Sequence, residues 1–245
     1  MNQVALITGA SRGIGAATAA RLGRRGYHVI VNYHRNEAAA RAVVQDIASA
    51  GGTAEAIQAD IRNPAQVADL VAACTRLDLL VCNANIAPTF APPSVMSWAD
   101  FSEKVMGELA AVFHVTQRAL ALMGRQRSGR IVYVSSVIAD VTMPAAVSHA
   151  TAKAALNTFA RQVAAEAGHH GITVNTVAPG MVRTEASAAA RTPERQKLLT
   201  KNSVLGRVTE PDDVAALIAA LADDGFHAVS GAHIPIDGGF QLLKP

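Results

Sequence analysis

A short apolar run, followed at once by a glycine-rich turn and an alanine-rich helix, restricts the fold of this chain most. The run is Val4 to Thr8, the turn contains Gly9, Gly13 and Gly15, and a helix is predicted over residues 16–25. Short runs of apolar strand formers are typical of strands buried on both faces. Glycines allow a tight turn and a close approach of the backbone to a phosphate at the amino end of the helix. The pattern therefore predicts a dinucleotide-phosphate site rather than a plain turn.

The end of the second predicted strand indicates which dinucleotide would bind. An acidic residue at this place would bind the ribose 2′-hydroxyl of NAD. The residues present are Asn32, Tyr33, His34 and Arg35, and Arg12 lies in the glycine turn. Two guanidinium groups without a carboxylate favour a 2′-phosphate, so the sequence predicts NADP(H) as the cofactor. The alternative is that Arg35 is only a solvated residue at the start of a helix.

Strand-like and helix-like runs alternate along the whole chain. Further strands are predicted over residues 28–33, 54–60, 77–83, 130–135, 172–178 and 232–236. Further helices are predicted over residues 37–50, 64–74, 98–123, 150–167 and 211–221. Such alternation predicts a parallel sheet covered by helices on both faces. The predicted fold is α/β, a Rossmann-like doubly wound sheet of about seven strands, in a single domain over residues 1–245.

Composition limits the kinds of partner. Half of the residues are hydrophobic and 17% are charged, which predicts a large core and no disorder. The net charge of +3, without a dense Lys/Arg run, argues against nucleic acid and suits a phosphorylated ligand. No apolar run has membrane-spanning length and no signal pattern opens the chain, so we expect no membrane partner and a cytoplasmic location. Cys74 and Cys82 are predicted to be buried free thiols, and no metal site is predicted.

The stretch from Ser136 to Lys153 contains the candidate catalytic groups. It follows a predicted strand and leads into a predicted helix, so it lies at a strand's carboxyl end, where open α/β sheets bind ligands. His149 and Lys153 are four residues apart, which places them on one face of a helix. A hydroxyl, an imidazole and an ammonium group together form a plausible acid–base site. The alternative is that His149 is a packed, hydrogen-bonded residue without a chemical role.

Taken together with residues further along the chain, these features make the chain resemble the short-chain dehydrogenase/reductase family. The matching pieces, in the family's order, are Thr8-Gly9-Ala10-Ser11-Arg12-Gly13-Ile14-Gly15, Asp60, Asn83-Ala84, Ser136, Lys153, Asn175, Pro179-Gly180 and Asp237-Gly238-Gly239. The subgroup it is most similar to is the 3-oxoacyl-carrier-protein reductases, which are ketoreductases. The resemblance implies a small carbonyl substrate, free or bound to a carrier protein. It also implies a homotetramer, or failing that a dimer, built on two long helices and the last strand.

The residues and the resemblance together give an expected cofactor site. Asp60 is expected to hydrogen-bond an adenine amine, and Lys153 to hold the nicotinamide ribose. The full expected set is Gly9, Ser11, Arg12, Gly13, Ile14, Gly15, Asn32, Arg35, Asp60, Ile61, Asn83, Ala84, Asn85, Lys153, Pro179, Gly180, Val182 and Thr184. The polar, alanine-rich and basic segment 184–206 is predicted to be a mobile lid over the substrate.

The candidate site departs from the family pattern at three positions. In the family, a Tyr four residues before the Lys is the acid, a Ser orients the carbonyl, and an Asn on the long helix holds a water. Here Ser136 and Lys153 match, but His149 takes the Tyr position and Glu108 falls at the Asn position. Asn85 takes the third position of the usual Asn-Ala-Gly.

These departures leave three hypotheses open. A histidine, with a reference pKa near 6.5, can donate a proton at neutral pH. Lys153 would favour neutral His149 and Glu108 would favour imidazolium, so the two charges oppose each other. The first hypothesis is an NADPH-dependent carbonyl reductase with His149, or a water, as the acid, and the retained Ser136 favours it. The second is a non-redox cyclase, dehydratase or isomerase that uses His149 with Glu108. The third is a catalytically inactive binding or partner subunit.

Overall fold

Seven parallel strands form one sheet in the computed structural model, which describes residues 2–188 and 192–243. The strands lie in the order β3-β2-β1-β4-β5-β6-β7, and every neighbouring pair is parallel. Their bounds are β1 Val4–Ile7, β2 His28–Tyr33, β3 Thr53–Gln58, β4 Leu79–Cys82, β5 Gly129–Val134, β6 Ile172–Pro179 and β7 His233–Ile236. The direction in which strands are added reverses between β1 and β4. The predicted doubly wound sheet is therefore confirmed. Sheets of this kind bind their ligands at the carboxyl ends of the strands beside such a reversal.

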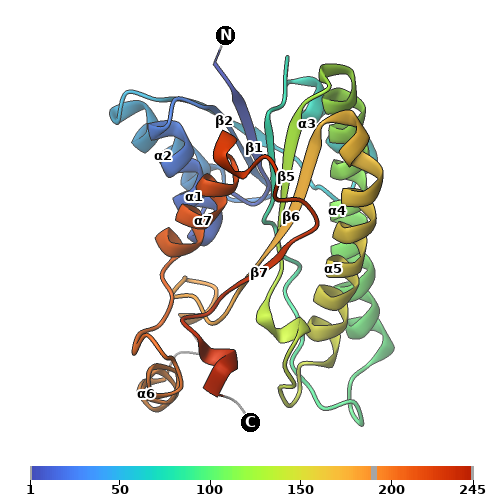
Figure 1. The fold of residues 1–245 in the computed structure, drawn as a ribbon. Coiled ribbons are helices and arrows are strands. Elements are labelled where there is room, and N and C mark those ends of the chain that lie inside the picture. Colours follow the sequence, from blue (N-terminus) through green and yellow to red (C-terminus); the bar gives the residue numbers. More distant parts are fainter. Residues whose placement is uncertain (1, 189–191, 244–245) are drawn as a thin grey trace.

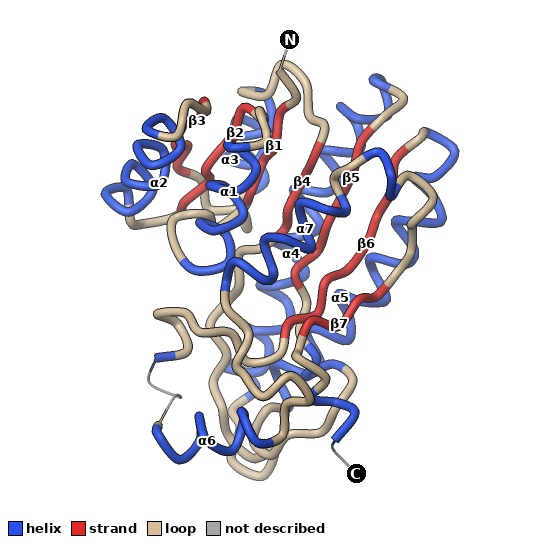
Figure 2. The backbone as a smooth tube through the Cα atoms, turned by 60° about the vertical axis from the view of Figure 1, so that its left-hand side comes forward, coloured by secondary structure: helices blue, strands red, loops and turns tan. Residues whose placement is uncertain are grey.

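Helices cover both faces of the sheet (Figures 1 and 2). One face carries α1 Gly13–Arg24, α2 Glu37–Ser49 and α7 Pro211–Leu221. The other carries α3 Pro64–Ala72, α4 Trp98–Gln126 and α5 Val147–Ala167. A further helix, α6 Pro193–Lys201, lies beyond the carboxyl ends of the strands, at the lower left of Figure 1. The residues at the end of each strand therefore face an open edge between the two helical layers.

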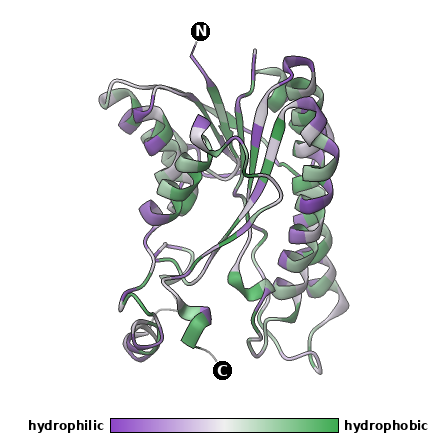
Figure 3. Cartoon of the chain, viewed as in Figure 1, coloured by the Kyte–Doolittle hydropathy of each residue, from purple (hydrophilic) through white to green (hydrophobic). Residues whose placement is uncertain are grey.

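Side chains alternate along the strands and supply two cores. Leu6, Leu80 and Ile131 are buried on the side of α4 and α5, whereas Ile7 and Val81 are buried on the side of α1 and α7. This alternation is the period of two that a strand imposes. Figure 3 shows hydrophobic colour along the strands and on the helix sides that face them. Because both faces are covered, the strands read as continuous apolar runs in the sequence.

Most element bounds agree with the sequence to within a few residues; α4 and α5 each differ at one end, and the difference in α5 bears on the site. The long helix α4 continues to Gln126 and ends at Arg127, which has a left-handed φ of 57°. Helix α5 begins at Val147, earlier than the predicted start at Ala150. His149 therefore lies inside the first turn of α5.

Two predictions from composition can be compared directly with the structure. Cys74 and Cys82 are buried free thiols, as predicted, and burial raises the pKa of each to about 12. Among the described helices, none combines the length and the apolar character needed to cross a bilayer.

Candidate active site at the carboxyl ends of the strands

The glycine turn after β1 is held by the residues that follow β4. The Asn83 side-chain amide donates to the carbonyl oxygens of Thr8, at 2.9 Å, and Gly9, at 3.1 Å. The Thr8 hydroxyl accepts from the backbone N–H groups of Asn83 and Ala84. A Cβ added at Gly9 would lie 2.9 Å from the Ala84 Cα, and one at Gly15 would lie 2.6 Å from the Gly9 carbonyl oxygen. The close contacts explain why glycine stands at both positions.

Helix α1 has an open N-terminus beside glycines, the arrangement predicted for a phosphate site. Gly13 begins the helix with φ of 56°, and a Cβ there would lie 3.2 Å from the Thr184 Cγ2. Arg12, at the N-cap, provides no side-chain cap. The first N–H groups of the helix therefore keep their capacity to bind an anion. Ser11 and Ile14 lie on either side of this N-cap position, so the predicted cofactor turn forms one cradle.

Asn32, at the end of β2, holds the glycine turn in place by hydrogen bonds. It is buried, and its Oδ1 accepts from the Gly9 N–H at 3.3 Å. Its Nδ2 donates to the carbonyl oxygens of Ile57, at 3.3 Å, and Ala59, at 3.2 Å. Asn32 thus joins the glycine turn to the end of β3, and its amide is occupied by backbone partners.

A cavity of about 580 Å³ lies beyond the ends of β2 and β3. It is lined by His34, Arg35, Ile57, Gln58, Asp60, Gln66, Asp69 and Leu70. Arg35 is exposed here, in the place where the sequence predicts a 2′-phosphate contact. The Asp60 carboxylate accepts from the Arg62 Nε at 3.0 Å and Nη2 at 2.9 Å, which holds its pKa at about 2. Arg62 therefore already pairs with Asp60 at the place where the sequence predicts an adenine contact. The neighbouring predicted position, Ile61, lies beside the same pair.

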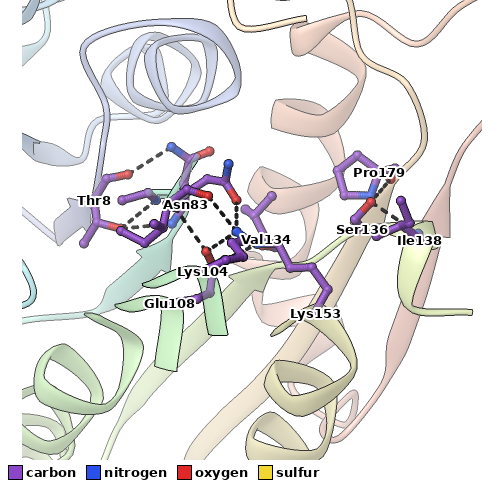
Figure 4. A network of polar contacts seen from close by, with 12 residues as sticks. Thr8, Asn83, Lys104, Glu108, Val134, Ser136, Ile138, Lys153 and Pro179 are labelled. Atoms are coloured by element: carbon purple, nitrogen blue, oxygen red, sulfur yellow. Dashed lines mark hydrogen bonds and ion pairs between the residues drawn. The ribbon is translucent and has the colours of Figure 1, made fainter. Parts of the chain in front are cut away.

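Ser136 joins the ends of β5 and β6. Its Oγ donates to the Pro179 carbonyl oxygen at 3.5 Å, a long and weak bond, and accepts from the Ile138 N–H at 3.3 Å. Figure 4 shows Ser136 with Pro179, apart from the group around Glu108. Within the described residues, no hydrogen bond links Ser136 to His149 or Lys153. The hydroxyl lies at the predicted strand end, but its hydrogen bonds are to Pro179 and Ile138 rather than to the other candidate groups.

Glu108, on α4, joins two buried lysines (Figure 4). Its Oε1 accepts from the Lys153 Nζ, and its Oε2 accepts from the Lys104 Nζ at 2.5 Å. The exposed fractions of the three side chains are 2% for Glu108, 4% for Lys153 and 1% for Lys104. Lys153 also donates to the Val134 carbonyl oxygen at 3.0 Å. Burial would raise the pKa of Glu108, but Lys153 and Lys104 together lower it to about 2. Glu108 is therefore a carboxylate at neutral pH.

Lys104 is a member of the site that sequence reasoning missed. Besides Glu108, it donates to the Asn85 Oδ1 and to the Ile86 carbonyl oxygen, both at 2.8 Å. Burial lowers its pKa to about 8, against the opposing effect of Glu108. The signal that was available is the spacing of four residues between Lys104 and Glu108, which places the two charges on one side of a helix.

His149 is a neutral imidazole at the edge of this charged group. Its ring lies edge-on to Phe90, with centroids 6.2 Å apart. Its Nδ1 is buried and has no hydrogen-bond partner in the described part of the chain. Burial, then Lys104 and Lys153, lower the pKa of His149 to about 3, although Glu108 opposes this. The opposition expected from the sequence is thus resolved towards neutral His149, because burial and a second lysine act with Lys153.

The remaining predicted positions lie at the end of β6 and in the segment after it. A Cβ at Gly180 would lie 2.9 Å from the Asp237 Cβ, so this glycine packs tightly against the segment after β7. Val182 pairs with Thr209 in an isolated bridge. Asn175, one of the family matches, donates to the Val229 carbonyl oxygen at 2.7 Å and serves β6 rather than the site.

The predicted lid, 184–206, is only partly described. It contains a turn closed by Ser187, whose Oγ donates to the Val182 carbonyl oxygen at 2.7 Å, and it contains α6. Its far end docks on Gly238, whose carbonyl oxygen accepts from the Ser203 hydroxyl at 3.0 Å. Residues 189–191 lie outside the described residues, and the lid function stays a prediction.

Comparisons with known proteins bear on the same residues. The family model described as enoyl-(acyl carrier protein) reductase matches residues 9–241. A short-chain dehydrogenase/reductase of Serratia marcescens is 32% identical in sequence and superposes with a TM-score of 0.89, over 97% of each chain. The chain belongs to the short-chain dehydrogenase/reductase family. Its members are oxidoreductases that use a nicotinamide cofactor, and the glycine cradle of this chain fits such a group.

Two further relatives are enzymes whose names state an activity. The 3-oxoacyl-[acyl-carrier-protein] reductase of Synechocystis is 37% identical, over 98% of this chain and 98% of its own. The acetoin dehydrogenase of Enterobacter cloacae is 32% identical with a TM-score of 0.90, over 100% of this chain and 98% of its own. Both relatives match the chain from end to end, so this chain is an oxidoreductase of the short-chain dehydrogenase/reductase type.

Proposed function

We propose that this chain is an NADPH-dependent reductase of a small carbonyl compound, with His149 in place of the family's Tyr. The observation that carries the proposal is the common edge of the sheet at which the glycine cradle, Lys153 and a neutral imidazole lie. The relatives that reduce 3-oxoacyl thioesters or act on acetoin support a ketone substrate, free or on a carrier protein. We further propose a homotetramer in the cytoplasm.

The neutral imidazole of His149 acts by hydrogen bonding. A bound nicotinamide cofactor would supply the hydride for the carbonyl carbon. Because the pKa of His149 is about 3, the ring has one N–H at pH 7 and no extra proton to give. It donates that N–H to the carbonyl oxygen and polarises the bond, as neutral imidazole does in other enzymes. The Lys104–Glu108–Lys153 group has a net charge of about +1 at neutral pH, which stabilises the negative charge that develops on this oxygen.

The proton itself comes from Lys153 or from water. An ammonium group has three N–H donors, and within the described residues Lys153 uses two of them, on Glu108 and Val134. The third is the donor that remains for the ribose, the substrate or a bridging water. This arrangement differs from the family pattern, in which Tyr is the acid.

A direct test is NADPH oxidation with 3-oxoacyl thioesters, acetoin-like ketones and cyclic ketones. We expect turnover with at least one ketone class and loss of turnover in Lys153→Met. Glu37→Gln, an exposed change on α2, is the matched control and should leave the rate unchanged. If no ketone is reduced by the wild type while His149→Tyr gains activity, the non-redox or binding alternatives hold instead.

A further inference from the structure

The unusual residues of the site form one connected unit rather than three separate departures. Asn85 and Glu108 each replace a different residue of the family pattern. Lys104 Nζ bonds to both, at 2.8 Å to the Asn85 Oδ1 and 2.5 Å to the Glu108 Oε2. The other oxygen of Glu108 accepts from Lys153. A single buried ammonium group therefore connects the loop after β4 to the lysine of α5.

We propose that Lys104 is a positioning residue of the active site, which fixes Glu108 as a bridge and thereby sets where the Lys153 ammonium lies. This inference rests on the proposed function, because it gives Lys104 a part in carbonyl reduction. Lys104 itself is fully buried and touches no reacting group, so it acts only through its neighbours.

The hydrogen bonds of Lys104 are saturated within the described residues. Its three N–H donors are taken by Asn85, Ile86 and Glu108. The Ile86 N–H in turn donates to the Glu108 Oε2 at 3.1 Å. Lys104 of α4 thus donates to the loop, and the loop donates back to Glu108 of α4. These bonds restrict rotation of the Glu108 carboxylate. A buried charge is tolerated when its donors are all paired, which is the case for Lys104.

Charge gives Lys104 a second, measurable effect. The charged groups that face His149 are Lys104 and Glu108 from α4 and Lys153 from α5. The other close ring is the uncharged Phe90. Removing the Lys104 charge leaves Glu108 and Lys153 as a neutral pair beside His149. The imidazole should then become easier to protonate, so its pKa should rise.

The test is a double-mutant cycle of Lys104→Met and Glu108→Gln on the cofactor-free full chain. Urea unfolding should give a coupling of about tenfold or more in the unfolding equilibrium constant. The matched control is Arg41→Met with Glu37→Gln, an exposed pair with the same spacing on α2, for which we expect about twofold. NMR titration of the His149 imidazole should show a higher pKa in Lys104→Met than in wild type.

Kinetics then separate positioning from packing. Lys104→Met should lower kcat by about tenfold or more, and Lys104→Gln, which keeps a donor without the charge, should recover part of this loss. A variant that is less stable but has wild-type kcat and a wild-type His149 titration would overturn the proposal. The titration and the unfolding cycle need no turnover, so they remain decisive if the proposed reductase activity itself fails.

Discussion

His149 shows how the place of a residue decides its chemistry. As an amino-acid type, histidine ionises near neutral pH, which suggested a proton donor. In the structure, burial and the charges of Lys104 and Lys153 keep it neutral. Its position in the first turn of α5 also favours the neutral form, because a helix amino end disfavours a cation. The ring is therefore a hydrogen-bond donor at the pH where the protein would work.

The pH dependence of the rate distinguishes the two roles of His149. A reaction that needs neutral imidazole keeps its full rate above the folded pKa of about 3 and loses it as the pH falls through that value. A reaction that needs imidazolium would instead lose its rate as the pH rises through the pKa of the donor, which is about 6.5 for an unperturbed histidine. We therefore expect no fall in kcat near pH 6.5 that can be assigned to His149. The pH profiles of the wild type and of His149→Ala should have the same shape in this range. We also expect His149→Ala to lower kcat by about 100- to 1000-fold, the usual cost of a lost oxyanion donor.

Arg35 gives a prediction about cofactor choice. It is exposed at the cavity beyond β2, and the two residues directly after the strand are His34 and Arg35 rather than an acidic residue. Replacing Arg35 by Asp should weaken NADPH binding and strengthen NADH binding, because a carboxylate repels the 2′-phosphate and accepts from a 2′-hydroxyl. Calorimetry of both cofactors measures this. Equal affinities of the wild type for NADPH and NADH would contradict the electrostatic interpretation.

At the scale of the element, the start of α1 packs closely against the turn after β1 and against Asn83, which follows β4. Gly15→Val would place its Cβ 2.6 Å from the Gly9 carbonyl oxygen and 2.6 Å from the Asn83 Nδ2, so turn and helix must separate. We expect a loss of about 1–3 kcal/mol in unfolding free energy and the loss of cofactor binding. The matched control is Gly124→Ala in α4, where no atom lies within 4 Å and a small gain in stability is expected. A Gly15→Val protein that still binds cofactor would show that the cradle is not the binding site.

The elements were predictable from the sequence, whereas the state of the site was not. Apolar runs and glycines are local signals, so strands such as His28–Tyr33 were found with their bounds. Lys153 was found through its spacing of four residues from His149. Lys104 was missed, because its contact with Asn85 exists only once α4 packs beside the loop after β4. The charge of His149 likewise depends on how α4 and α5 approach each other, which no local pattern records.

At the scale of the whole molecule, α4 and α5 present apolar side chains to the outside. Met106 is 64% exposed and Phe113 is 49% exposed, and Phe113 lies 6.4 Å from the ring of Phe159 on α5. By the family resemblance, we expect this face to pack against a second copy in a homotetramer or dimer. Light scattering should show that Phe113→Asp gives a smaller species. Leu198→Asp on α6, also an exposed apolar position, should leave the assembly unchanged.

The contrast between the buried lysines and the exposed Arg35 has a consequence for ionic strength. Mobile ions screen exposed charges over about 10 Å at 0.1 M salt, but they do not enter a packed interior. Added salt should therefore weaken the attraction between Arg35 and a 2′-phosphate while leaving the Lys104–Glu108–Lys153 group unscreened. In this molecule, the affinity for the cofactor should therefore depend on the salt concentration, whereas the electrostatics of the buried reaction site should not.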